Sequence, residues 1–249
     1  MKRETQNLLL LLIGGAVLWI ALDGRYLNYV KPSLYPFLVI SGIGFVVLAL
    51  VAIVRDIRRG AAPANPEHGT GRAQWLLLGP VAALLLIAPP ALGADAAVTS
   101  SPVQVVPRDS AADEPKQWPF PPLPPGAAPN LPILDLVNRA LQDSHHSLDG
   151  REVTISGFVL RPKALEQQRT DTPDVDLARV VITCCVADAR YVLVHLAGMP
   201  EVIEDDAWLE VRGVVDPNSA RRDPDLTPTI VVTSYQRIPA PDRRYEHGR

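Results

Sequence analysis

The sequence has little cysteine. Its 249 residues include only two, Cys184 and Cys185, and these are adjacent. Neighbouring Cα atoms lie about 3.8 Å apart, whereas an unstrained disulfide needs at least about 4.4 Å. A relaxed disulfide between the two is therefore excluded. Three interpretations stay open: a strained redox-active bridge, a site for a soft metal or another thiol-reactive ion, and two small apolar side chains that only pack.

The sequence also lacks the patterns of catalysis and of nucleic-acid binding. It contains no nucleophile–base–orienter triad, no phosphate-binding loop and no paired carboxylates suited to acid–base chemistry. The formal net charge is -3, and residues 131–249 carry 14 Lys and Arg against 19 Asp and Glu, a net charge of -5. Grooves that bind nucleic acid are basic. We therefore expect a protein that is not an enzyme and has no nucleic-acid partner.

Three apolar segments occupy the first 94 residues, at about 5–22, 34–54 and 75–92. A membrane-spanning helix needs about 20 mostly apolar residues, so the sequence predicts three spans in a lipid bilayer. The second and third segments contain no charged residue, whereas transport pathways usually need polar groups inside the membrane. We expect these helices to anchor the chain or to pack on a partner, with the glycines near residues 14–15 and 41–44 as close-approach surfaces.

The distribution of positive charge predicts the orientation in the membrane. Lys2 and Arg3 precede the first segment, and four arginines follow the second, whereas the loop between them has only Arg25 and Lys31. The positive-inside bias then places the N-terminus in the cytoplasm and, with three spans, everything after residue 92 outside. If the third segment did not span, the C-terminal region would be cytoplasmic. The stretch at 94–96 also resembles a cleavage site.

A proline-rich stretch separates the membrane region, 1–94, from a C-terminal domain at 131–249. Ten prolines lie between residues 98 and 132. Such density disfavours helix and sheet and favours extended polyproline structure. Residues 95–130 are therefore predicted to form a semi-rigid linker that holds the domain away from the bilayer.

The C-terminal region begins with helical periodicity and then changes to a period of two. Residues 133–148 have the apolar spacing of a helix, and Pro132 suits its start. Alternating runs separated by turn signals then predict five strands, at residues 151–160, 179–185, 190–196, 207–215 and 229–237. The expected fold is a membrane α-helical region of three spans, followed by an all-β, five-stranded OB-like barrel with a preceding helix.

The two cysteines fall at the end of the second predicted strand. In a regular strand, Cys184 and Cys185 point to opposite faces of the sheet. One ion can therefore use both thiolates only if the strand breaks there, and a hairpin turn at residues 186–189 provides a place for a break. Soft thiolates suit Zn(II) or Cu(I), so a transition metal is a candidate cofactor.

Four further side chains are candidate ligands of such an ion. Asp188 and His195 are the nearest candidates, and His145 and His146 are the others. Each has a structural alternative. Aspartate readily makes a turn, histidines favour helix C-termini, and His195 lies where a strand surface is expected. Adjacent cysteines also differ from the usual metal-binding pair, which is separated by two residues.

Four stretches carry a resemblance to a known family. They are Gly157-Phe-Val, Arg179 ahead of Val181-Ile-Thr-Cys-Cys-Val-Ala-Asp188, Trp208-Leu-Glu-Val-Arg-Gly213, and the tail Ile238-Pro-Ala-Pro-Asp-Arg-Arg-Tyr245. On these residues the chain resembles the YcgQ-like permease-subunit family. The resemblance implies membrane segments followed by a Cys-Cys barrel, with Arg179, Cys184, Cys185 and Asp188 in one binding motif. It also implies a polytopic permease as partner.

These observations lead to one expected function and two alternatives. We expect an accessory subunit of a permease in the cell membrane, whose extracytoplasmic barrel binds a metal or thiol-reactive ion or gates its partner. The first alternative is an extracytoplasmic thiol-redox protein that uses the adjacent cysteines. The second is a structural envelope protein whose barrel binds only another protein.

Overall fold

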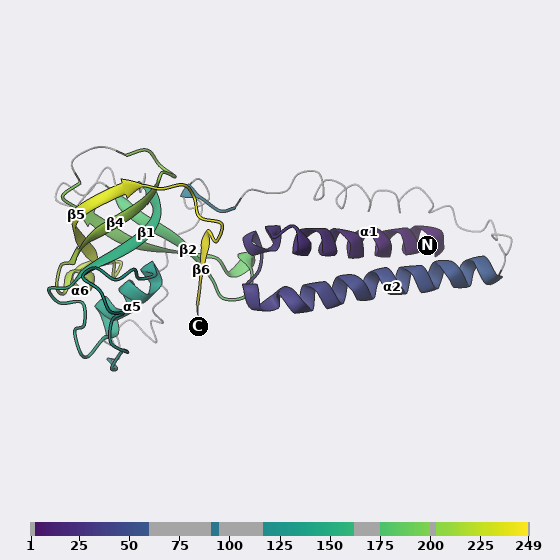
Figure 1. The fold of residues 1–249 in the computed structure, drawn as a ribbon, viewed down its shortest axis with the longest axis horizontal. Helices are drawn as coiled ribbons and strands as arrows, with labels where there is room; N and C mark the ends of the chain where they lie inside the picture. Colours follow the sequence, from purple (N-terminus) through teal and green to yellow (C-terminus); the bar gives the residue numbers. More distant parts are fainter. Residues whose placement is uncertain (1–2, 60–90, 95–116, 162–174, 200–202, 249) are drawn as a thin grey trace. The chain divides into compact units, whose positions relative to one another are not determined.

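The computed structural model describes residues 3–59, 91–94, 117–161, 175–199 and 203–248. The chain divides into two compact units, Met1–Ala91 and Leu92–Arg249, and Figure 1 shows both. Most of the third predicted span and the first part of the predicted linker lie outside the described residues.

The first unit is a pair of antiparallel helices that lie side by side (Figure 1). Helix α1 runs over Arg3–Leu22 and helix α2 over Tyr35–Arg59, with the short 3-10 helices η1 (Arg25–Asn28) and η2 (Pro32–Leu34) between them. The predicted segments at about 5–22 and 34–54 are thus helical. Both are rich in leucine, isoleucine and valine with few breakers, as helices of apolar surroundings are.

Glycines allow α1 and α2 to approach each other closely. A Cβ on Gly14 would lie 2.9 Å from the Cβ of Phe45, and one on Gly42 would lie 2.8 Å from the Cγ of Leu18. Gly15 and Gly44, by contrast, have open space beside them. Gly14 and Gly42 therefore serve the contact between the two helices, whereas Gly15 and Gly44 face away from it.

One helix among the described residues is long and apolar enough to cross a membrane. It covers Pro32–Arg58 with a mean hydropathy of 3.0, whereas the apolar helix at Gln6–Leu22 is shorter. Large apolar side chains on the longer helix are exposed, with Phe37, Ile40 and Ile57 between 66% and 74% accessible. The helix is thus a candidate membrane span. Of the three predicted spans, the described residues support one, the second, as a helix that could cross a membrane.

The second unit is built around a closed β-barrel. Its strands are β1 (Glu152–Leu160), β2 (Asp176–Ile182), β3 (Arg190–Ala197), β4 (Trp208–Val215), β5 (Thr229–Arg237) and β6 (Tyr245–His247). The sheet order is β1-β4-β5-β3-β2-β6, and an additional pairing of β1 with β2 closes the first five strands into a barrel. Strands β3 and β5 are parallel, and the other neighbours within the barrel are antiparallel.

The short strand β6 occupies an edge that the barrel leaves open. Strand β2 pairs with β3 along one edge, while on the other edge only its first residues, 176–178, pair with β1. Residues 180–182 pair in parallel with β6. The C-terminal tail therefore completes the hydrogen bonding of β2, which would otherwise present unpaired backbone groups at the point where it leaves β1.

A helix and a continuous apolar core support the barrel. Helix α5 (Ile133–Gln142) covers one end of it, and its residues Ile133, Leu136, Val137 and Leu141 are buried in the core (Figure 1). Gly157 lies where β1, β2 and α5 meet, and a Cβ there would lie 2.5 Å from the carbonyl oxygen of Ala178. The glycine is therefore needed at the seam where the barrel closes.

The predicted five-stranded barrel with a preceding helix is confirmed, with three differences. Strand β2 begins and ends three residues earlier than expected, β6 was not predicted, and α5 ends at Gln142 rather than near residue 148. The helix ends there because the carboxylate of Asp143 accepts hydrogen bonds from the backbone N–H of His145 (2.9 Å) and Ser147 (3.1 Å). Such local bonds offer the backbone an alternative to the helical ladder.

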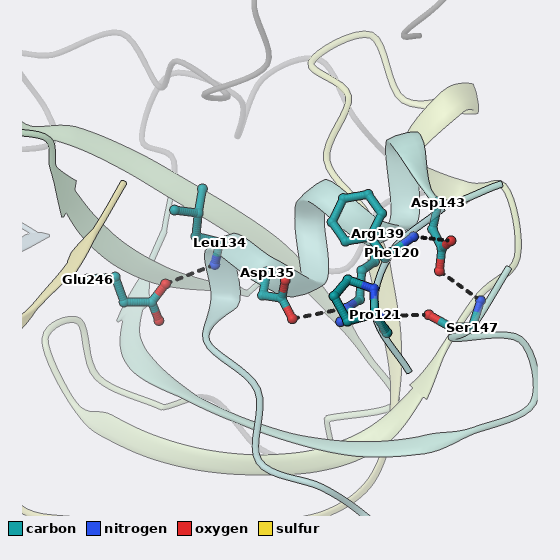
Figure 2. A network of polar contacts seen from close by, with 8 residues as sticks. All are labelled: Phe120, Pro121, Leu134, Asp135, Arg139, Asp143, Ser147 and Glu246. Carbon is teal, nitrogen blue, oxygen red and sulfur yellow. Dashed lines mark hydrogen bonds and ion pairs between the residues drawn. The ribbon is translucent and has the colours of Figure 1, made fainter. Parts of the chain in front are cut away.

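Figure 2 shows the polar contacts that fix α5. The buried Arg139 donates to Asp135 (2.9 Å), to the carbonyl of Pro121 (2.8 Å) and to the hydroxyl of Ser147 (3.0 Å), and it lies over the ring of Phe120. Residues 117–130 fall in the predicted linker, yet at Pro121 and Phe120 they pack on this helix. The described end of the proline-rich stretch is therefore part of the barrel unit.

Candidate functional site

The cysteines lie in a loop, residues 183–188, that joins β2 to β3; we call it the thiol loop. The side chain of Asp188 organises it. Its Oδ1 accepts a hydrogen bond from the N–H of Thr183 at 2.7 Å, and its Oδ2 accepts those of Cys184 at 2.8 Å and Cys185 at 3.3 Å. These three N–H groups bond to one carboxylate, and the sheet ladder of β2 stops at Ile182.

The break in the strand brings the two thiols together. Their Sγ atoms lie 3.6 Å apart, and both cysteines are free thiols. Cys185 caps the 3-10 helix η4 (Val186–Asp188), so the pair no longer follows the alternation of an extended strand. Ligand atoms of Cys184, Cys185 and Asp188 all lie within 4.8 Å of one another. Cys184 is exposed and Cys185 is half-buried, so the group is accessible from solvent.

The carboxylate of Asp188 also sets the acidity of the neighbouring thiol. A hydrogen bond to Asp188, a second to Cys185 and the negative charge of Asp188 together raise the pKa of Cys184 to about 11. Conversely, the hydrogen bond from Cys184 and those from the backbone hold the pKa of Asp188 well below its usual range. Reactive cysteines have the opposite environment, electropositive and with a lowered pKa. At neutral pH, Cys184 is therefore a protonated thiol beside a carboxylate.

The donor set fits a soft cation. Two thiols and a carboxylate are ligands that Zn(II) accepts, and the thiols also suit Cu(I). Thiols must lose their protons to become ligands, and a bound cation would offset the charge that now disfavours this loss. Zn(II) usually takes four ligands, so a fourth would have to come from water or from a partner.

His195, a fourth ligand suggested by the sequence, lies elsewhere. Its Nδ1 is 2.5 Å from Oδ1 of Asp176, its Nε2 is 3.4 Å from Oδ2 of Asp223, and the residue is buried. Because His195 pairs with Asp176 at the start of β2, about six strand residues, or roughly 20 Å, separate it from the thiol loop. His145 and His146 are exposed in the turn after α5.

The charge state of His195 follows from these contacts. Burial lowers the pKa of His195, but the hydrogen bond to Asp176 and the charges of Asp176 and Asp223 more than offset this and raise it overall. His195 alternates along β3 with the core residues Val194 and Leu196, so this structural ion pair with the carboxylates lies on the face of the strand that points away from the main core. It links β3 to β2 and to the turn that precedes β5.

Arg179, the fourth residue of the expected motif, lies in β2 and is buried. Its guanidinium carbon is 4.7 Å from the ring centroid of Trp208, its Nη2 donates to the carbonyl of Arg243 at 3.1 Å, and its Nε is 3.6 Å from Oε1 of Glu246. Burial lowers the pKa of Arg179, and the charge of Glu246 opposes this. These contacts join β2 to β4 and to the C-terminal tail, so Arg179 supports the strand that leads into the thiol loop.

Two residues near the C-terminus were missed by the sequence analysis. Glu246 accepts hydrogen bonds from the N–H groups of Ile133 and Leu134, both at 2.9 Å, at the start of α5. Figure 2 shows the bond from Leu134. Tyr245 accepts one from the N–H of Leu92 at 2.8 Å. A strand of three residues carries too little periodicity to be detected. The only signal in the sequence was that the resemblance extended to Tyr245.

The fold and the site together define a closed five-stranded barrel that carries two adjacent thiols and a carboxylate on an exposed loop. A protein-family model described as DUF1980 C-terminal domain matches residues 136–247. The match covers most of α5, all of the barrel strands, the thiol loop and β6. It is consistent with the resemblance to the YcgQ-like family. A comparison with curated proteins finds no match.

Proposed function

We propose that this chain is a non-enzymatic membrane subunit of a permease, whose extracytoplasmic OB-like barrel binds a soft metal or another thiol-reactive cation at the thiol loop. One observation carries the proposal: Cys184, Cys185 and Asp188 place their ligand atoms within 4.8 Å of one another on an accessible loop. The sequence alone required a break in the strand for this, and the carboxylate of Asp188 makes that break.

The topology of the barrel supports the location of the binding site. The cyclic order β1-β2-β3-β5-β4, with β3 and β5 parallel, agrees with an OB-type barrel. OB-type barrels bind ligands on the face of strands 2 and 3 and on the loops that join strands 1 to 2 and 4 to 5. The thiol loop joins β2 and β3, so it lies beside the surface that such barrels use. The likeness to OB-type barrels is one of fold, and the thiol loop itself supplies the ligand chemistry.

A titration of the reduced full-length protein with Zn(II) and with Cu(I) tests the cation site. We expect saturable binding by the wild type and no detectable binding by the Cys184→Ser/Cys185→Ser double variant. Ala187→Ser is the matched control, because it adds a hydroxyl to the same loop and leaves both thiols in place. Equal affinities for the wild type and the double variant would exclude the site.

The helix hairpin supports the proposed docking on a polytopic permease. Gly14 and Gly42 are used within the hairpin, whereas Gly15 and Gly44 leave open space at its surface, where another helix can approach closely. We expect a many-span protein to co-purify with the wild type and to be lost in a Gly15→Leu/Gly44→Leu variant. A chain that always isolates alone would count against the subunit role.

The electrostatics of the loop disfavour the alternative of a thiol-redox protein. A redox-active pair needs a thiolate at ambient pH, and Asp188 raises the pKa of Cys184 to about 11 instead. Intact mass measured with and without reductant distinguishes the two functions. A mass that rises by two hydrogens on mild reduction would favour the redox alternative.

A further inference from the structure

The residues that follow the third apolar segment are held by the barrel through three side chains. The N–H of Leu92 donates to the hydroxyl of Tyr245 at 2.8 Å, and the hydroxyl of Tyr191 donates to the carbonyl of Gly93 at 3.0 Å. The N–H of Ala94 donates to Asp206 at 2.6 Å. A Cβ on Gly93 would lie 2.6 Å from Oδ1 of the same carboxylate, so a larger residue there would displace the Asp206 side chain. Residues 92–94 are therefore a docked segment and not a free tether.

The strand that supplies Tyr245 also ends beside the thiol loop. In the parallel pairing of β6 with β2, Tyr245 lies opposite Val180 and His247 lies opposite Ile182. The N–H of Gly248 then donates to the carbonyl of Ile182 at 3.2 Å. Ile182 is the last residue of β2, and the next residue, Thr183, already bonds to Asp188. One short strand thus connects the base of the thiol loop with Leu92.

Strand β6 is held by contacts on both sides of its middle residue. Its middle residue, Glu246, accepts two hydrogen bonds from the start of α5 and lies 3.6 Å from the buried guanidinium of Arg179. Consecutive residues of β6 therefore contact different elements, namely residue 92, α5 and the end of β2. Packed elements of this kind move as units and do not deform continuously.

We propose that β6 transmits the occupancy of the thiol loop to residues 92–94, where the barrel unit begins. The inference rests on the proposed function, since it presupposes a cation at Cys184 and Cys185. A cation bound by both thiols would order the thiol loop, whose first N–H groups are bonded to Asp188. That ordering stabilises the end of β2, the pairing of β2 with β6, and through Tyr245 the hydrogen bond to Leu92.

Hydrogen exchange of the reduced full-length protein in nanodiscs, with and without saturating Zn(II), tests this inference. Coupling between sites commonly changes an equilibrium by about fivefold or more. We expect Zn(II) to slow exchange of the Leu92 amide by at least about that factor. The Ala94 amide, held by Asp206 outside β6, reports any general stabilisation and should slow less.

Two conservative variants separate the proposed route from general stabilisation. Tyr245→Phe removes the hydroxyl supplied by β6, and Tyr191→Phe removes a hydroxyl that β3 supplies to the same segment. We expect Zn(II) binding to persist in both, and the Zn(II)-dependent change at Leu92 to vanish only in Tyr245→Phe. Three outcomes would overturn the inference while leaving the proposed function intact. In the wild type, bound Zn(II) could leave exchange of the Leu92 amide unchanged, or it could slow the Ala94 amide as much as the Leu92 amide. In Tyr245→Phe, the Leu92 amide could still respond fully to Zn(II). Absence of Zn(II) binding by the wild type would refute both.

Discussion

Replacement of Asp188 by asparagine should make Cys184 more reactive. The structure shows Asp188 as the main cause that raises the pKa of this thiol from its ordinary value of 9.0 to about 11. Asparagine keeps the shape of the side chain but removes the charge and one acceptor. We therefore expect the pKa of Cys184 to fall toward its ordinary value in the Asp188→Asn variant.

The size of the effect follows from two opposing terms. At pH 8, a thiol of pKa 11 is about 0.1% thiolate and one of pKa 9 is about 9% thiolate, a gain of nearly two orders of magnitude. A thiolate of lower pKa is intrinsically less nucleophilic, and a Brønsted coefficient of about 0.4–0.5 lowers the alkylation rate per thiolate by roughly eightfold. The net expectation is an alkylation rate about tenfold higher at pH 8.

The assay is the pH dependence of alkylation by iodoacetamide, measured by mass spectrometry. A Cys185→Ser background leaves Cys184 as the only thiol, and Ala187→Ser in the same background is the matched loop control. The midpoint of the profile should move to lower pH in Asp188→Asn and stay in place in the control. An unchanged midpoint would refute the assignment of Asp188 as the group that keeps this thiol protonated.

Three further predictions concern stability and packing. The folded-state pKa of His195 is raised, so its ion pairs contribute fully to the free energy of unfolding below the unfolded-state pKa of about 6.5, and this contribution is lost as the pH rises through the folded-state pKa. The difference in Tm between the wild type and His195→Asn should therefore shrink from pH 6 to pH 9. Glu246→Gln weakens the acceptor that caps α5 and should lower the free energy of unfolding by about 1 kcal/mol in urea titrations, with an unchanged value contradicting the capping role. Gly42→Leu should loosen the α1–α2 hairpin, seen as faster proteolysis in detergent, whereas Gly44→Leu should not, because Gly42, unlike Gly44, lacks room for a side chain.

Local patterns were sufficient to predict the barrel. Alternation located the strands with one face toward the core, and apolar runs bounded by turn signals located β2 and β3, which are buried on both faces. Strand ends were less predictable. Asp143 ended α5 early and Asp188 ended β2 early, and in both cases a side-chain carboxylate took backbone N–H groups that the periodic pattern assigned to regular structure.

Long-range pairing accounts for what was missed. Glu246 caps a helix more than a hundred residues earlier in the chain, and His195 bonds to Asp176 and lies near Asp223, so no local window contains either site. His195 was considered as a ligand of the cysteines because it is close to them in sequence. The pairing of β2 with β3 instead places it at the far end of the hairpin.

The sequence by itself determined that this chain has an apolar N-terminal region, a five-stranded barrel and one pair of adjacent thiols, because hydropathy, periodicity and residue identity are local properties. It also showed that the thiols can act together only if their strand breaks. Only the tertiary structure decided that the break exists, that Asp188 makes it, and that His195 is engaged elsewhere. These outcomes depend on which distant groups meet when the barrel closes, and that is a property of the packed chain as a whole.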